Sequence, residues 1–154
     1  MKKILLSSVA LLSLVTTLPV NSPVSAQESI SPKAYSHSNG SWIQSNGRWW
    51  YKHSDGSYTK NGWEKINETW YYFDSEGWMK TGWFNEYGNW YYLDDSGAMK
   101  TGWCLISGSW YYLNTSGVMQ TGLQTIEGKQ YYLADSGAMQ TGWHNIGDDT
   151  YFFA

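Results

Sequence analysis

The chain of 154 residues is rich in aromatic side chains, with 11 Trp, 13 Tyr and 4 Phe, and all of them except Tyr35 lie at or after Trp42. This density of rings excludes a generic helical domain and an acidic disordered chain, because disordered segments are poor in aromatic residues. The net charge of −3 argues against a nucleic-acid partner. The single cysteine, Cys104, excludes an internal disulfide and a zinc site built on cysteines.

Residues 1–26 have the features of a secretory signal peptide. Two lysines precede an apolar run over residues 4–15, and small residues lead to a cleavage site after Ala26. A membrane anchor is the alternative, but the run is interrupted by Ser and Thr and falls short of the roughly 20 residues that span a bilayer. We therefore expect a secreted protein with no membrane span after cleavage. Residues 27–41, rich in Ser, Pro and Asn, are predicted to be a flexible N-terminal arm.

From Trp42 onward the sequence repeats itself about every 20 residues, which decides the architecture. A tryptophan opens the unit, a second tryptophan follows seven residues later, two aromatic residues come next, and an Asp or Asn, a Gly and a Met close it. The repeat domain, residues 42–154, divides into five full units and one shorter unit: 42–60, 61–80, 81–100, 101–120, 121–140 and 141–154.

Each unit carries the signal of a β-hairpin. In unit 81–100, a short strand through Trp83 and Phe84 is followed by a link of 3 to 5 residues that ends at Gly88, and then by an aromatic strand over residues 89–93. Both faces of this hairpin are apolar, and an isolated hairpin is marginal in water, so neighbouring hairpins must cover it. The sequence therefore predicts an all-β repeat solenoid of β-hairpins.

The repeated rings divide into rows with different expected roles. The rows of Tyr and Met are expected to belong mainly to the core: Tyr72, Tyr92, Tyr112, Tyr132, Met79, Met99, Met119 and Met139. The two rows of Trp are too large to be buried completely twice in every unit, and we expect them to line clefts between hairpins. A cleft walled by several rings suits a quaternary ammonium ion, and it also suits the apolar face of a sugar.

The motif Thr-Gly-Trp, Gly-x-Trp-Tyr-Tyr-Leu and Asp-x-Ser-Gly-x-Met, seen in residues 81–99, resembles the choline-binding repeat of Gram-positive surface proteins and of wall lysins. The resemblance covers residues 42–154. It implies a left-handed superhelix of hairpins that binds choline or phosphocholine on the wall's teichoic and lipoteichoic acids, with each site shared by consecutive repeats. It also implies a protein held non-covalently on the cell wall, with no cofactor.

Carried onto this chain, the resemblance implies four aromatic cages. They consist of Trp42, Trp49 and Tyr71; of Trp63, Trp70 and Tyr91; of Trp83, Trp90 and Tyr111; and of Trp103, Trp110 and Tyr131. Met79, Met99 and Met119 are candidate additional walls. Trp78 either covers a neighbouring cleft or adds a wall to it, and spacing alone does not decide which tyrosine of each pair faces the ligand. Because Leu123 and Gln130 replace both tryptophans at the fifth junction, three or four working sites are expected.

The other residues favour no catalytic or metal chemistry. The three histidines lie at unrelated repeat positions, and the recurring acids lie where turns need them, so we expect neither an enzyme nor a metal site. Two alternative functions remain open: a glucan-binding repeat protein, and a surface adhesin with an unidentified protein partner. The end at Ala154 is open to three interpretations, a natural cap, a homodimer contact and the truncation of a longer protein.

Overall fold

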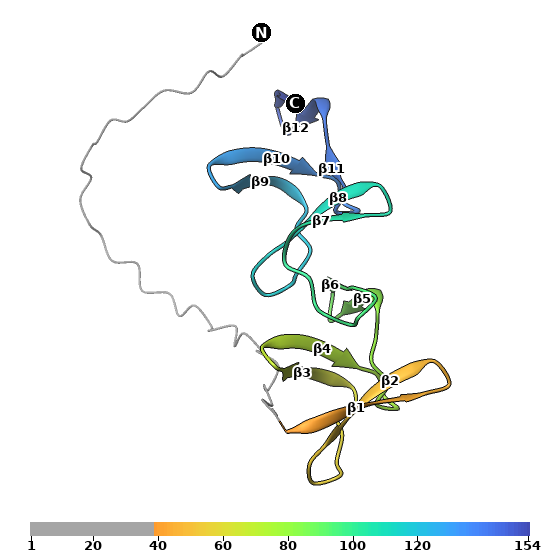
Figure 1. Cartoon of the computed structure of the whole chain (residues 1–154). Helices are drawn as coiled ribbons and strands as arrows, with labels where there is room; N and C mark the ends of the chain where they lie inside the picture. Colours follow the sequence, from red (N-terminus) through yellow and green to blue (C-terminus); the bar gives the residue numbers. More distant parts are fainter. Residues whose placement is uncertain (1–38) are drawn as a thin grey trace, which may run out of the picture.

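The computed structural model describes residues 39–154, which form an all-β chain of successive hairpins without a helix (Figure 1). The predicted signal peptide and nearly all of the predicted arm, residues 1–38, lie outside the described residues. The strands are β1 (Gly40–Ser45), β2 (Arg48–His53), β3 (Gly62–Ile66), β4 (Thr69–Phe73), β5 (Gly82–Glu86), β6 (Asn89–Leu93), β7 (Gly102–Ile106), β8 (Ser109–Leu113), β9 (Gly122–Ile126), β10 (Lys129–Leu133), β11 (Met139–Gln140), β12 (Gly142–Ile146) and β13 (Asp149–Phe153).

Every predicted unit holds one antiparallel hairpin. The pairs are β1–β2, β3–β4, β5–β6, β7–β8, β9–β10 and β12–β13. The methionine that closes a unit then returns to the end of the second strand. Met79, Met99 and Met119 form single bridges there, and Met139 opens the short strand β11 beside β10. The prediction of hairpin repeats is confirmed, and each closing methionine pairs with the end of the second strand, through a single bridge or, for Met139, the short strand β11.

The hairpin turns are shorter than the sequence predicted. In the hairpin β5–β6, Glu86 pairs with Asn89, so the link is the two residues Tyr87 and Gly88 and not a loop of 3 to 5. These two residues have φ values of 50° and 85°, the positive pair of a type I′ turn. The prediction was wrong because the first strand continues through Asn85 and Glu86, whose polar side chains do not look like a strand in an aromatic repeat.

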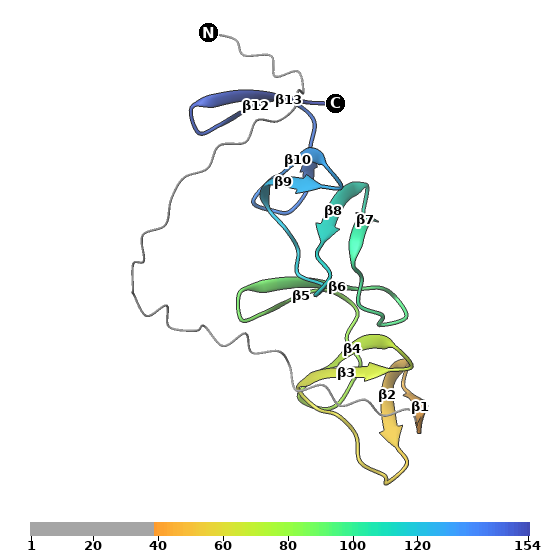
Figure 2. The ribbon, with the colours of Figure 1, turned by 90° about the vertical axis from the view of Figure 1, so that its left-hand side faces the viewer.

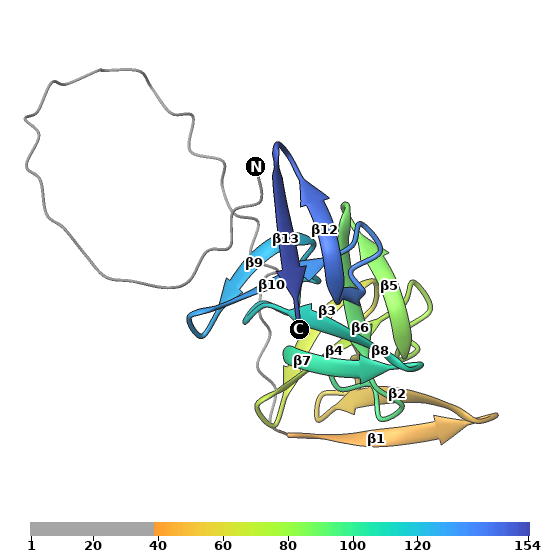
Figure 3. The same ribbon diagram turned by 90° about the horizontal axis from the view of Figure 1, so that it is seen from above.

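The hairpins are stacked along one axis and turn about it (Figures 1 and 2). Viewed along the stack, β1–β2 and β7–β8 point the same way, β3–β4 and β9–β10 share a second direction, and β5–β6 and β12–β13 share a third (Figure 3). Each hairpin is therefore rotated from the one before it, and successive hairpins follow one another around the rod (Figure 3).

The innermost row of the core lies at the ends of the second strands. Phe73, Leu93, Leu113 and Leu133 are all no more than 1% exposed. The row of second tyrosines, which the sequence predicted as core, is less deeply placed: Tyr72 is buried, whereas Tyr92, Tyr112 and Tyr132 are half-buried. Burying each Leu contributes roughly 1.5–3 kcal/mol to stability. The row of Phe and Leu at the strand ends therefore forms the centre of the stack, and the tyrosines surround it.

Neighbouring units are joined by a methionine that lies against a glycine. A Cβ added to Gly97 would come 2.3 Å from Sδ of Met79, and one added to Gly117 would come 2.5 Å from Sδ of Met99. Both glycines also have φ of 82°, which favours glycine. The Gly-x-Met motif that closes each unit thus supplies both halves of the joint between units.

A buried ionisable pair ties the first hairpin to the second. Nε2 of His53, at the end of β2, lies 2.9 Å from Oε1 of Glu64 in β3, and these side chains are 7% and 0% exposed. Nδ1 of His53 lies 2.8 Å from the hydroxyl of Ser57, which in turn donates to Asp55. In the next three units the residue at the position of His53 is an Asp or Asn that accepts hydrogen bonds from the backbone of its own turn. In the first unit, His53 instead makes a contact with the second unit.

Candidate aromatic cages

The structure brings the opening tryptophan of each of four units onto a tyrosine of the next unit. The ring centroids are 4.8 Å apart for Trp42 and Tyr71, 4.9 Å for Trp63 and Tyr91, 4.9 Å for Trp83 and Tyr111, and 4.7 Å for Trp103 and Tyr131, with interplanar angles of 62–63°. The partner from the next unit is the first tyrosine of the pair in every case. Four contacts of one geometry therefore recur along the rod.

The second-strand tryptophans stand at the outer edge of these contacts. Trp49, Trp90 and Trp110 are 38%, 45% and 43% exposed, and Trp70 is half-buried. Trp70 lies edge-on to Trp63 at 6.5 Å, and Trp110 lies edge-on to Trp103 at the same distance. An edge-on pair leaves the face of one ring open, which is the surface that attracts a cation.

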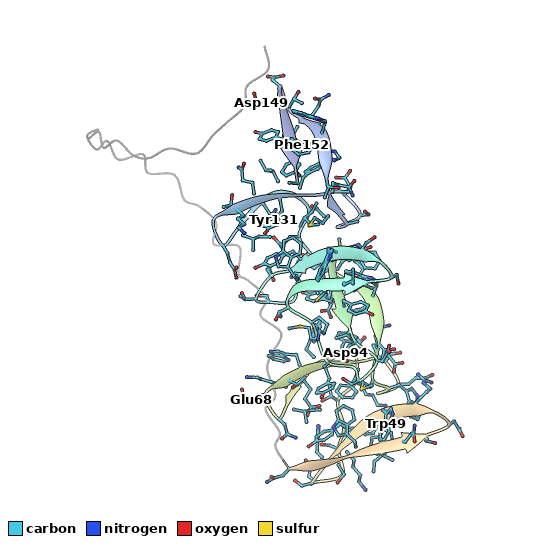
Figure 4. The ribbon with its side chains drawn as sticks, turned by 45° about the horizontal axis from the view of Figure 1, so that its top comes forward. Trp49, Glu68, Asp94, Tyr131, Asp149 and Phe152 are labelled. Carbon is cyan, nitrogen blue, oxygen red and sulfur yellow. The ribbon has the colours of Figure 1, made fainter. Side chains whose placement is uncertain are left out.

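The closing methionines lie at the same places. The backbone N–H groups of Met79, Met99 and Met119 donate to the carbonyl oxygens of Trp49, Trp70 and Trp90, one unit back along the chain. Met79 packs in one cluster with Trp42 and Tyr71, and Met99 packs in another with Trp63, Trp70 and Tyr91. Figure 4 shows the side chains gathered between successive hairpins, with Tyr131 on β10. The methionines thus connect successive units and also pack in the clusters that hold the tryptophan–tyrosine contacts.

The second cage differs from the others because it contains a carboxylate. Glu86 takes the repeat position of the buried residues Ile66 and Ile106, and its Oε2 accepts a hydrogen bond of 2.7 Å from Nε1 of Trp63. Trp63 is only 6% exposed and packs on Phe84 at 5.4 Å. Trp63 therefore offers less surface to a ligand than its counterparts do, and the negative charge lies at the N–H edge of its ring.

The same carboxylate changes the acidity of nearby phenols. Burial, and next the charge of Glu86, raise the pKa of Tyr72 to about 12. The same two causes, in the same order, raise the pKa of Tyr91. At the first cage, burial and then the charge of Asp94 raise the pKa of Tyr71. These rings stay neutral at physiological pH, so they can act as uncharged cage walls.

The fifth junction lacks a tryptophan pair. Leu123 and Gln130 take the places of the two tryptophans, and Tyr151 instead stacks on Phe153 of its own strand at 6.0 Å. A hollow of about 310 Å³ remains there, lined in part by Lys129 and Gln130. Beyond it, Trp143 and Phe152 are in contact at 5.1 Å and are 67% and 59% exposed, at the end of the rod opposite Trp49 (Figure 4).

Trp78 lies beside residues of the first unit. The guanidinium of Arg48 lies 4.5 Å from the centre of its ring, and Trp78 lines a separate hollow together with Trp50 and Tyr58. Sequence reasoning missed this hollow and also missed the role of Glu86. The signal for Glu86 was present, because it interrupts a row that is isoleucine in units 61–80, 101–120, 121–140 and 141–154.

The part of the chain that spans residues 39–154 holds no group of three or more His, Cys, Asp or Glu side chains that could bind a metal ion. It has no helix that is long and apolar enough to cross a membrane. Cys104 is a buried free thiol, and burial raises its pKa.

Comparison with known proteins agrees with the repeat. The family model described as "Choline-binding repeat" matches residues 60–101, 100–139 and 120–154. The chain is similar to the structure of CbpJ from Streptococcus pneumoniae, with 39% identity, a TM-score of 0.69, and coverage of 76% of this chain and 40% of that one. It is also similar to choline-binding protein F from the same species, with 40% identity, a TM-score of 0.68, and coverage of 73% and 42%.

A third similar structure is the multimodular pneumococcal cell wall endolysin from phage Cp-1, solved in complex with choline. It has 41% identity and a TM-score of 0.58, with coverage of 75% of this chain and 35% of that one. The chain thus spans about two-fifths or less of the length of these three structures. The comparison with curated protein sequences gave no match.

Proposed function

This chain belongs to the choline-binding repeat family, and on that premise we propose that it is a secreted, non-catalytic module that attaches to the bacterial cell wall. Its ligand is phosphocholine on teichoic and lipoteichoic acids, and its sites are the aromatic cages between successive repeats. The endolysin of phage Cp-1, which is similar to this chain, forms a complex with choline. Because that relative is much longer, its likeness supports the ligand of the repeats and not the activity of a whole protein.

One observation carries the proposal: the four contacts between an opening tryptophan and the first tyrosine of the next unit, all at 4.7–4.9 Å and 62–63°. Two rings crossed at such an angle form a corner, and the exposed Trp110 lies edge-on to Trp103 at one of these four contacts. A quaternary ammonium ion is bulky, weakly hydrated and unable to donate a hydrogen bond, so ring faces recognise it better than carboxylates do.

Several weak sites together explain retention on a wall. Each ring contributes about 0.5–2 kcal/mol, so three rings supply roughly 2–6 kcal/mol and one cage binds in about the millimolar range. The wall polymer repeats its ligand and the rod repeats its site, so every contact after the first is intramolecular. Each contact of matching geometry then raises the avidity by roughly a hundredfold to ten-thousandfold.

The test removes exposed rings from two cages at once. Trp90→Ala combined with Trp110→Ala is expected to lower retention on a tertiary-amine resin, while the far-ultraviolet circular dichroism stays unchanged because both rings are nearly half exposed. Loss of one ring should raise the choline Kd of each altered cage by roughly two- to thirtyfold.

The matched control is Tyr87→Ala, which removes a ring that is 96% exposed and lies in a turn outside every cage. Its retention and its elution by free choline should equal those of the unaltered protein. If the unaltered protein were released by dextran and not by choline, it would be a glucan-binding protein and the proposal would be wrong.

A further inference from the structure

Three aromatic rings outside the four cages meet at the β1–β2 end of the rod. Trp50, Tyr58 and Trp78 line a hollow of about 180 Å³ together with Glu76 and Gly77. The rings of Trp50 and Tyr58 lie edge-on with their centroids 5.2 Å apart and an interplanar angle of 72°. The hollow is formed by the first two repeat units and is separate from the cage of Trp42, Trp49 and Tyr71.

Two of these rings occupy cage positions of the repeat. Trp50 pairs with Ile43 across its hairpin as Tyr71 pairs with Glu64, so Trp50 holds the place of the cage tyrosine. Tyr58 holds the place of the closing methionine: a Cβ on Gly77 would come 2.6 Å from its ring, as a Cβ on Gly97 would meet Met79. Trp50 and Tyr58 of the first unit therefore hold the places of the tyrosine and the methionine that units 61–80 to 121–140 place against the unit before them.

The third ring comes from the following unit. Trp78 stands where the later units have Ala98, Val118 and Ala138, none of which carries a ring. It is half-buried, and it lines the hollow from the closing turn of the second unit. Trp78 thus adds a ring from the second unit to the two rings from the first unit.

Charged groups of both signs lie around the hollow. The carboxylate of Glu76 lines it, and its side chain is 71% exposed, so it can reorient toward a ligand. The guanidinium of Arg48 lies over Trp78 and pairs with Asp74 at 3.0 Å and with Glu76 at 3.6 Å, and the ammonium of Lys60 lies 4.9 Å from the centre of the Tyr58 ring. Neither Arg48 nor Lys60 is among the residues that line the hollow, so Glu76 is the charged side chain of its lining.

We propose that this hollow is an additional site for a quaternary ammonium ion, walled by Trp50, Tyr58 and Trp78 and charged by Glu76. The inference rests on the proposed function for the class of its ligand. It differs from the four cages in using no opening tryptophan. An exposed carboxylate such as that of Glu76 attracts a bound cation only weakly, so Glu76→Gln should weaken this site by about two- to fivefold.

The test follows the indole N–H resonances of the 11 tryptophans by NMR while choline is added to the purified protein. Trp50→Phe and Trp78→Ala assign two of these signals by their loss. Trp78→Ala introduces the residue that two later units carry at this position, so the fold should tolerate it. The expected result is that choline shifts the Trp50 and Trp78 signals together, and that Trp78→Ala raises the choline concentration needed to shift Trp50 by roughly two- to thirtyfold.

The outcomes separate the two proposals. If the signals of Trp90 and Trp110 shift while those of Trp50 and Trp78 do not, the additional site is refuted and the proposed function stands. If no indole signal shifts at millimolar choline, the proposed function fails and the additional site fails with it. A shift of the Trp50 signal that Trp78→Ala leaves unchanged would also overturn this inference, because the hollow would not be acting as one site.

Discussion

Removal of the carboxylate of Glu64 should destabilise the first two hairpins far more than the rest of the rod. In Glu64→Ala the side chain that lies 2.9 Å from Nε2 of His53 is lost, and both members of this pair are at least 93% buried, since they are 0% and 7% exposed. Deleting one member of a buried hydrogen-bonded pair costs about 1–3 kcal/mol, because the remaining polar group is left in a poorly solvated place. Glu64→Gln keeps an acceptor oxygen and should cost less.

The assay must resolve position along the rod, because a repeat protein need not unfold in a single step. Native-state hydrogen exchange should show that Glu64→Ala lowers the protection of amides in β1 to β4 and leaves β9 to β13 unchanged. Urea unfolding supplies the free energy. Equal losses of protection at both ends of the rod, or a total cost under about 1 kcal/mol, would refute the reasoning that this pair is a buried tie between two units.

Two further predictions concern other parts of the rod. Gly117→Ala places a Cβ 2.5 Å from Sδ of Met99 at a φ of 82°, whereas Gly108→Ala has a similar φ of 85° with nothing within 4 Å. The first substitution should lower the free energy of unfolding in urea by about 1–3 kcal/mol more than the second does. Equal losses would contradict the joint between Met99 and Gly117. At high pH the raised pKa of Tyr72, about 12 as a result of burial and then of Glu86, favours the protonated phenol in the folded state. Its contribution to stability is therefore complete below about pH 10 and decreases as the pH rises towards 12, by up to about 2–3 kcal/mol. Glu86→Gln should lower the pKa of Tyr72 and reduce this loss of stability. The midpoint of alkaline unfolding, followed by circular dichroism, should then move to higher pH, and an unchanged midpoint would show that Glu86 is not a cause.

The repeat could be predicted from the sequence because it follows from spacing, and the contacts between units because the resemblance to the choline-binding repeat implies them. When every unit adopts the same hairpin and the units stack, residues at equal repeat positions receive equal surroundings, so the contact between Trp83 and Tyr111 implies the one between Trp103 and Tyr131. The contact distances, at 4.9 and 4.7 Å, reflect this equivalence. Whether all four cages bind choline stays a prediction.

The features that the sequence did not predict are those where one unit departs from the others. Glu64 looks like a solvated strand residue, and its burial depends on His53 reaching it from the previous unit. Glu86 replaces an isoleucine and finds a partner in Trp63, 23 residues earlier. Such pairs are single tertiary contacts with no periodic signal, so a repeat alignment marks the positions as irregular but does not give the partner.

The joint between methionine and glycine has a consequence for how the gene can change. Because the joint of Met99 with Gly117 has the same form as that of Met119 with Gly137, in-frame recombination that removes or duplicates one unit in this region would create a junction that already fits. The rod would become shorter or longer by one hairpin, and the number of candidate cages would change by one. The first unit is not exchangeable in this way, since the tie between His53 and Glu64 matches it to a single neighbour.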